Sequence, residues 1–398
     1  MSTDLKGFFN AVLPLGRDWR VDRVEAGPER VIVWLAYHGA GPIYDQSEAR
    51  YWRHLDTVGV GTFLAARIPR VRDREGNIRQ VDVPWADDYS RYTTSFECQI
   101  LTELLANRSQ SATARLLGIS FSVVHQVMQR AVDRGMLRRG DDPKTLRYLS
   151  LDEKHYRTSG SKRQMVTVLS DPLHRRVLEV MPGRTKAAAI KAITASIPVQ
   201  GRAAVEAVSA DMCWSYHAAV EECLPRALVV LDKFHLSIQL NTAVDHTRRR
   251  ESRHREDLKG LRFDLMRSDL SDDRKAYIHS LRQAAARTAE VWKFKEDFRS
   301  LYQCRDRAEA EIYLETWLRD ALQEPAGFLN RVATTFTRFK TKILNFFDHP
   351  ITNARAERFN GWIQQLRVQA KGFKSFENFR TAVLFFFGNL DLYPRKSV

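Results

Sequence analysis

The chain has 398 residues, of which 44% are hydrophobic, and it carries 63 Lys and Arg against 48 Asp and Glu. This composition is typical of a folded protein of more than one domain and excludes global disorder. The net charge of +15 favours a polyanionic partner, either nucleic acid or an anionic membrane surface. The longest apolar runs, such as Ala382 to Phe387, are far shorter than the ~18–20 residues of a membrane-spanning helix. The N-terminus also lacks a secretory signal, so we expect a cytoplasmic protein with no membrane partner.

Residues 1–90 alternate apolar and polar positions in short stretches, as from Arg30 to Trp34. Turn residues such as Gly76 separate these stretches, which predicts a region of β-hairpins. The predicted hairpin around Gly76 carries five arginines: Arg67, Arg70, Arg72, Arg74 and Arg79. A basic ribbon of this kind suits a phosphate backbone, and a solvated strand face is the alternative.

Helical spacing of apolar residues begins near Ser95 and predicts a helix-turn-helix domain over residues 95–140. Ala114 lies four residues before Gly118 and Val124 six residues after it, as the turn between two packed helices requires. The outward face of the later helix offers hydrogen-bonding side chains for base edges in a major groove. They are Ser122, His125, Gln126, Gln129 and Arg130. A helical bundle with no role in DNA binding is the alternative.

Residues 147–240 predict three consecutive strands followed by alternating helices and strands. This order indicates an α/β fold, the first part of a ribonuclease H-like core with a mixed sheet. Residues 241–345 have almost no β-branched runs and predict an all-helical insertion. Helix resumes after His349-Pro350, and we assign residues 350–398 to the C-terminal part of the core.

Three aspartates, Asp152, Asp211 and Asp232, lie in or at the end of predicted buried strands, where an acid is costly unless it binds something. In a ribonuclease H-like sheet the strand of Asp211 lies beside that of Asp152. The two carboxylates then repel each other, and a divalent cation relieves the conflict. Glu357 is the candidate third ligand, on a predicted helix that presents Asn353 and Asn360 on the same face.

Each acid also has a structural interpretation. Asp152 is placed to pair with Lys154, and Asp211 to cap the following helix. Glu357 is placed to be an exposed acid in a basic stretch with Arg355 and Arg358. The four cysteines, Cys98, Cys213, Cys223 and Cys304, form no C-x-x-C pair, so we interpret them as small apolar residues.

Short motifs follow one another in a fixed order between residues 147 and 390. They are Ser150-Leu151-Asp152-Glu153, Leu178-Glu179-Val180 with Pro182-Gly183-Arg184-Thr185, Ala210-Asp211-Met212 with Tyr216, Val230-Leu231-Asp232-Lys233-Phe234-His235, Thr352 to Asn360, and Gly372-Phe373 with Phe376-Glu377-Asn378-Phe379-Arg380. In this order they resemble the conserved blocks of the DDE transposases of the ISL-three family of bacterial insertion sequences.

The resemblance implies that Asp152, Asp211 and Glu357 are the catalytic and metal-binding triad. Members of the family commonly begin with a cysteine-based zinc ribbon, whereas the region around His38 to Pro42 has no cysteines. We therefore interpret residues 1–90 as a β-rich region resembling a zinc ribbon without its cysteines, and predict no structural zinc.

The same resemblance implies a transposase that binds terminal inverted repeats and acts with Mg²⁺ or Mn²⁺, held as two ions. Such a site cuts a DNA strand, leaves a 3′-OH and joins it to target DNA. We expect a homo-oligomer on DNA, associated with the nucleoid. Asp232 and His235 are candidate auxiliary residues, with a buried structural pair as the alternative. A catalytically inactive or domesticated DNA-binding regulator of the same fold is the alternative function, and the presence of all three acids favours the enzyme.

Overall fold

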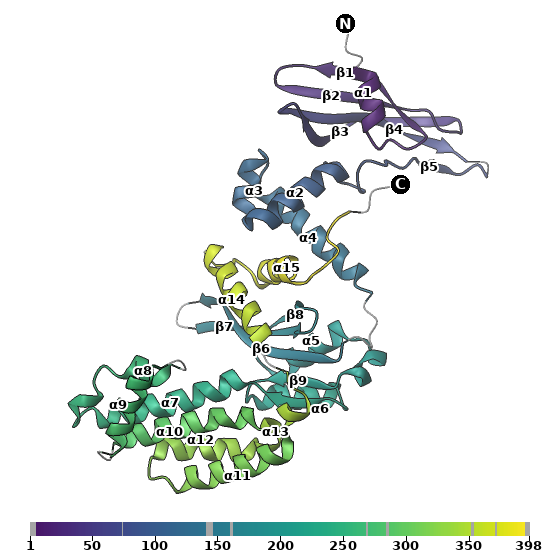
Figure 1. Ribbon diagram of the computed structural model, residues 1–398. Coiled ribbons are helices and arrows are strands. Elements are labelled where there is room, and N and C mark those ends of the chain that lie inside the picture. The colour runs from purple at the N-terminus through teal and green to yellow at the C-terminus, as the bar shows by residue number, and fades with distance from the viewer. Residues whose placement is uncertain are drawn as a thin grey trace. The chain divides into compact units, whose positions relative to one another are not determined.

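The computed structural model describes residues 5–73, 75–140, 146–159, 162–267, 270–283, 286–351, 354–370 and 372–394. Within them, the side chains of residues 158, 159, 162, 163, 282, 283 and 354–360 are not described. The chain divides into two compact units, the first formed by residues 1–140 with 390–398 and the second by residues 141–389 (Figure 1). Across the described ranges, every helix is too short or too polar to cross a membrane.

A five-stranded sheet with one helix opens the first unit. Its elements are α1 (Leu5–Val12), β1 (Trp19–Ala26), β2 (Arg30–Tyr37), β3 (Ile43–Thr57), β4 (Val60–Arg72) and β5 (Ile78–Gln80). The strand order is β1-β2-β4-β3 with β5 paired to β4, and β2 runs parallel to β4. The predicted hairpin around Gly76 is present as β4 and β5. Gly76 has a φ of 88°, a left-handed conformation that favours glycine.

The sheet of the first unit is held by an aromatic core. Trp19 and Trp52 both contact Trp85 edge to face, with ring centroids 4.9 and 5.5 Å apart. All three rings are almost completely buried, and such aromatic contacts stabilise a small sheet. Of the five arginines predicted on the basic ribbon, Arg70 pairs with Asp45, while Arg67, Arg72 and Arg79 are exposed. Arg74 lies outside the described residues.

Three helices follow in the first unit: α2 (Thr94–Asn107), α3 (Gln110–Leu116) and α4 (Phe121–Arg138). The hydroxyls of Thr93, Ser109 and Ser120 cap their N-termini. Ala114 and Val124 are buried, and Gly118 adopts a φ of 62° in the turn between α3 and α4. The small residue, the turn glycine and the apolar residue thus have the roles that the sequence pattern predicts.

The segment from Leu390 to Pro394, which we call the C-terminal strap, packs on α4. Arg134 donates to the carbonyl oxygen of Leu392 at 2.9 Å, and Arg138 donates to the carboxylate of Asp391 at 3.1 Å. A Cβ atom on Gly135 would lie 2.6 Å from that of Leu390, so only glycine allows this approach. We expected these residues to belong to the C-terminal part of the core. They belong to the first unit instead, because their partners are arginines of α4.

The second unit contains a mixed sheet of order β10-β9-β6-β7-β8. Its elements are β6 (Tyr148–Ser159), β7 (Lys162–Asp171), β8 (Arg176–Pro182), α5 (Lys186–Ser196), the 3₁₀ helix η2 (Val199–Ala204), β9 (Ala207–Ala210), α6 (Trp214–Cys223) and β10 (Leu228–Leu231). β6, β7 and β8 pair antiparallel, whereas β6, β9 and β10 pair in parallel. The predicted mixed sheet is therefore present, and the strand before Asp211 lies beside that of Asp152.

Helices cover both faces of this sheet. Leu149 and Leu151 of β6 share a core with residues of α5 and α6. The opposite face is covered by α14 (Ala354–Gln369), which packs on β6, and α15 (Phe376–Phe387), which packs on β8. Because side chains alternate along a strand, Asp152 belongs to the face of α14 and α15.

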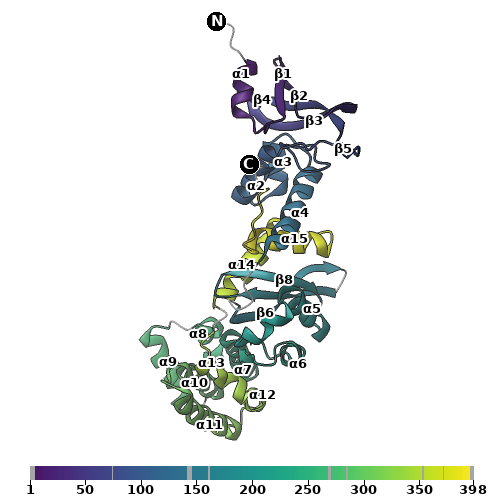
Figure 2. The ribbon, with the colours of Figure 1, turned by 90° about the vertical axis from the view of Figure 1, so that its right-hand side faces the viewer.

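An all-helical segment links β10 to α14. It comprises α7 (Lys233–Glu251), η3 (Glu256–Leu258), α8 (Arg262–Met266), α9 (Asp272–Gln283), α10 (Arg287–Ser300), η4 (Leu301–Gln303), α11 (Arg307–Gln323), α12 (Gly327–Arg338) and α13 (Lys340–Asp348). Helices α10 to α13 lie side by side (Figure 2). They share a core that includes Trp292, Phe298 and Phe336. The amide of Asn345 on α13 donates to Val229 of β10 at 2.9 Å and fastens the segment to the sheet.

Candidate active site and DNA-reading helix

Three aspartates follow one another across neighbouring strands: Asp152 lies within β6, and Asp211 and Asp232 directly follow β9 and β10. The parallel register pairs Ser150 with Ser209, and Ala210 with Leu231. Continued to the next residues, it sets Asp152 opposite Asp211 and Asp211 opposite Asp232. We call this row of three carboxylates the acidic edge. The sheet therefore brings together the two predicted triad aspartates and the auxiliary Asp232.

Asp152 is only 5% exposed, and its carboxylate is engaged locally. One oxygen accepts the backbone N–H of Glu153 at 2.7 Å, and the other lies 3.0 Å from the Nζ atom of Lys154. The ion pair with Lys154 that the sequence suggested as an alternative is thus formed. The lysine does not prevent a role of Asp152 in phosphate chemistry, because the cation also attracts a phosphate.

Asp211 is half-buried, and its carboxylate accepts the backbone N–H of Cys213 at 3.1 Å. Burial raises the pKa of Asp211 above its ordinary value, and the charges of Glu153 and Asp152 raise it further. His235 acts in the opposite direction. Burial is thus the main cause of the raised pKa, and the neighbouring acids add to it.

Asp232 and His235 form a hydrogen-bonded pair at the same edge. Asp232 caps α7 by accepting the N–H of Phe234, and its second carboxylate oxygen lies 3.0 Å from Nδ1 of His235. That hydrogen bond raises the pKa of His235, and the charges of Asp152 and Asp211 raise it too, whereas burial lowers it. The ring is therefore held as a potential cation directly beside the acidic edge.

Glu357 lies in α14, but its side chain is outside those that the structure describes. The same holds for its two predicted neighbours. Asn353 lies outside the described residues, and the side chain of Asn360 is not described. Among the described side chains, no three acids, histidines or cysteines converge as ligands of one metal ion. The complete triad therefore stays a prediction.

The donor chemistry of the acidic edge fits a hard divalent cation. Its ligands would be carboxylate oxygens, which Mg²⁺ and Mn²⁺ prefer, and a cation would favour the charged form of Asp211, which burial disfavours. The four cysteines are free: Cys98 lies in α2 and Cys223 ends α6, whereas Cys213 and Cys304 lie outside the helices and strands.

The predicted DNA-reading residues lie on α4. Ser122, Gln126 and Gln129 are exposed, and His125 is half-buried. Arg130 forms an ion pair with the buried carboxylate of Glu97 on α2. Sequence reasoning missed this pairing because the two residues are far apart in the chain and no local pattern joins them.

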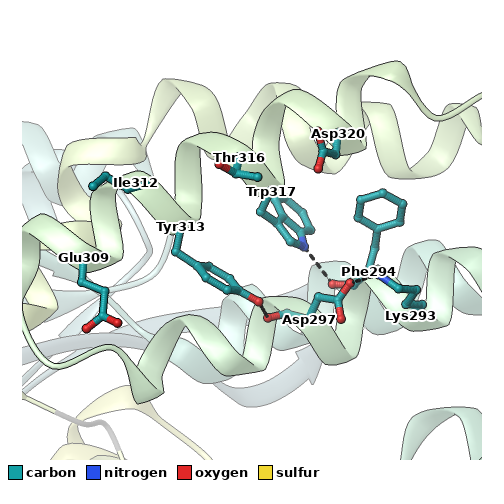
Figure 3. Close-up of a pocket in the computed structure, with 9 residues that line it drawn as sticks. All are labelled: Lys293, Phe294, Asp297, Glu309, Ile312, Tyr313, Thr316, Trp317 and Asp320. Carbon is teal, nitrogen blue, oxygen red and sulfur yellow. Dashed lines mark hydrogen bonds and ion pairs between the residues drawn. The ribbon is translucent and has the colours of Figure 1, made fainter.

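A cavity of about 420 Å³ lies in the helical segment, away from the acidic edge. Residues of α10 and α11 line it: Lys293, Phe294, Asp297, Glu309, Ile312, Tyr313, Thr316, Trp317 and Asp320 (Figure 3). Tyr313 donates to the carbonyl of Asp297 at 2.6 Å, and Trp317 donates to that of Phe294 at 2.9 Å. These hydrogen bonds join α11 to α10, so the polar atoms of Tyr313 and Trp317 stabilise the packing of the two helices.

Residues 149–383 match the ISL3 family of DDE domains described as "Transposase", and residues 81–132 match the "Helix-turn-helix domain of transposase family ISL3". The chain is 26% identical over 329 residues to the transposase for insertion sequence element IS1001 of Bordetella parapertussis, covering 79% of each chain. It is 26% identical over 365 residues to the transposase for element IS1557 of Mycobacterium tuberculosis, covering 83% of this chain and 80% of the relative.

A solved structure, titled "Drosophila P element transposase strand transfer complex", is similar with a TM-score of 0.41 and 11% identity, over 75% of this chain and 93% of that one. The family match spans more than half of the chain and includes the acidic edge. The protein belongs to the ISL3 family of DDE transposases and carries that family's helix-turn-helix domain.

Proposed function

We propose that the protein binds the terminal inverted repeats of an insertion sequence through α4 and catalyses metal-dependent cleavage and strand transfer of DNA at the acidic edge. The observation that carries the proposal is the row of Asp152, Asp211 and Asp232 across three adjacent parallel strands. The strand order and the helices on both faces support a ribonuclease H-like core with an all-helical insertion.

Two anchors of α14 support Glu357 as the third acid. Ile351, just before the helix, packs with Ala207 and Val230 beside the start of β6. Near the other end of the helix, Arg367 hydrogen-bonds His155 of β6. The helix therefore follows β6 in the same direction.

The length of the helix then indicates which residues of β6 lie nearest to the backbone of Glu357. The segment from Glu357 to Arg367 rises about 15 Å, which equals roughly four to five residues of strand. Counting back from His155 by that length reaches Ser150 and Leu151, next to Asp152.

Asp152, Asp211 and Glu357 would hold the divalent cation that DDE transposases use, which we propose to be two Mg²⁺ or Mn²⁺ ions. Bound there, the metal supplies activation of the attacking oxygen and neutralises charge at the phosphorus. The protein itself contributes fixed positions, because strand register sets the spacing of the aspartates. We assign His235 to hold a phosphate oxygen, with Asp232 fixing its ring through Nδ1.

The DNA-binding part of the proposal rests on α4 and the family match to residues 81–132. Ser122, Gln126 and Gln129 are exposed on the helix that enters a major groove in helix-turn-helix proteins. The net charge of +15 supplies affinity that does not depend on sequence. We further propose that the protein acts on DNA as a homo-oligomer, at the nucleoid.

The test is strand cleavage of a labelled terminal-repeat end in Mg²⁺, with gel-shift binding measured in parallel. Asp152→Asn, Asp211→Asn and Glu357→Gln each remove one negative charge but keep the size of the side chain. We expect cleavage and strand transfer to fall by orders of magnitude while binding persists, because α4 is unchanged. Asp232→Asn should have a milder effect.

Asp320→Asn is the matched control, because it removes the same charge from an exposed acid of α11 and should cleave like the wild type. If Glu357→Gln also cleaves like the wild type, the triad is wrong and Glu153 or Asp232 must be reconsidered. A wild-type protein that binds the repeat but never cleaves it would support the regulator instead.

A further inference from the structure

Phe121 is the first residue of α4 and has a large apolar side chain in contact with solvent. It is 53% exposed, although the next inward positions of the helix, Val124, Val127 and Met128, are fully buried. Ser120 caps the helix by accepting the N–H of Val123, which fixes the first turn. The ring is thus presented at the N-terminal end of the proposed DNA-reading helix.

The ring of His125, one turn further along the helix, stacks beside the ring of Phe121. The two rings are nearly parallel, with an interplanar angle of 6° and centroids 6.4 Å apart. Ser122 and Gln126 are exposed next to them. The aromatic pair therefore flanks the polar side chains that we propose to contact base edges.

The chemistry of the major groove determines what such a ring can recognise. Base edges there present hydrogen-bond donors and acceptors, and the apolar exception is the C5-methyl group of thymine. In helix-turn-helix proteins the N-terminal residues of the second helix reach these edges. We infer that Phe121, with its ring held by His125, reads the C5-methyl group of a thymine in the terminal repeat. This inference rests on the proposed function, because it requires that α4 bind the repeat.

The experiment replaces each thymine of a terminal-repeat duplex in turn by deoxyuridine, which lacks only the methyl group. Binding by the full-length protein is measured at one fixed salt concentration, with a scrambled duplex as the reference. For the wild type we expect a loss of roughly three- to fivefold at one thymine, the size of one lost apolar contact. Phe121→Ala should weaken binding to the unmodified repeat about tenfold and should show no further loss at that thymine.

Two variants separate recognition from general effects. Phe121→Leu keeps an apolar side chain and should retain sensitivity to the methyl group. Leu137→Ala removes an 89% exposed apolar side chain about 24 Å further along the same helix, and it should bind like the wild type.

The inference is overturned if no thymine is sensitive in the wild type, or if the loss persists in Phe121→Ala. A wild type that binds the repeat no better than the scrambled duplex would overturn the proposed function itself, and this inference with it.

Discussion

Buried acids occur in both units, but their surroundings differ. In the first unit, Glu97 is 2% exposed and receives the guanidinium groups of Arg130 and Arg134. In the second unit, Glu179 is matched by Arg380 in a two-pronged pair with distances of 2.7 and 2.6 Å. Each of these carboxylates is balanced by a fixed cation, and each ties one element to another.

The acidic edge is balanced differently. The pKa of Asp211 is raised by burial and by its acidic neighbours, so its negative charge is opposed by its surroundings. Lys154 contacts Asp152, and His235 contacts Asp232. Glu97 and Glu179 therefore hold elements of the fold together, whereas we propose that the charge of the acidic edge is balanced by an added cation.

The largest effect on stability is expected for Glu97→Gln. The change leaves Arg134 and Arg130 facing a neutral amide in a buried setting, and should lower the free energy of unfolding by roughly 3 kcal/mol. Urea denaturation followed by circular dichroism measures this loss. Glu103→Gln, on the same helix, should change it by less than about 0.5 kcal/mol. Equal midpoints for the two variants would mean that Glu97 does not stabilise the helices.

The next effect separates two residues of α4. Gln126→Ala should cost ~1–3 kcal/mol in binding to the terminal repeat and little for random DNA, because base-edge contacts discriminate between sequences. Arg130→Ala should also lower the stability of the protein, since its guanidinium pairs with Glu97. Gel shifts at fixed salt and urea denaturation of both variants test this. If Gln126→Ala lost equal affinity for both DNAs, Gln126 would contact the DNA backbone and not a base edge.

The smallest expected effect is a gain in stability. Asp211→Asn should raise the free energy of unfolding by about 1 kcal/mol at pH 7 without metal, because it removes an opposed charge. The raised pKa means that the folded state binds the proton more tightly than the unfolded state. The wild type should therefore gain stability as the pH falls toward that pKa, and Asp211→Asn should lose this part of the gain. Denaturation at a series of pH values would contradict the comparison if Asp211→Asn were the less stable protein.

Patterns that repeat along the chain made much of the architecture predictable. Ala114, Gly118 and Val124 were enough for the helix-turn-helix, because that motif depends on local spacing. Asp152 and Asp211 were expected to meet because the order of strands and helices constrains which strands can be neighbours, and the observed register agrees.

Contacts between distant residues were not predictable in the same way. The pairing of Arg130 with Glu97 and the parallel pairing of β2 with β4 leave no periodic signal. The contact of Asp391 with Arg138 joins residues 253 positions apart, through a segment too short to show a pattern. Such contacts are decided by the packed structure as a whole.

The C-terminal strap has a consequence for the order in which the protein is made. Leu390 to Pro394 leave the ribosome after every residue of the second unit, yet they complete the packing of α4 in the first. Domains generally fold as units during synthesis, beginning with the N-terminal ones. Here the packing of α4 in the first unit is complete only once Leu390 to Pro394 have been made. A nascent chain that stops before Leu390 presents the Gly135 side of α4 without this covering, so the helix that we propose to read DNA gains these contacts only after the second unit has been made.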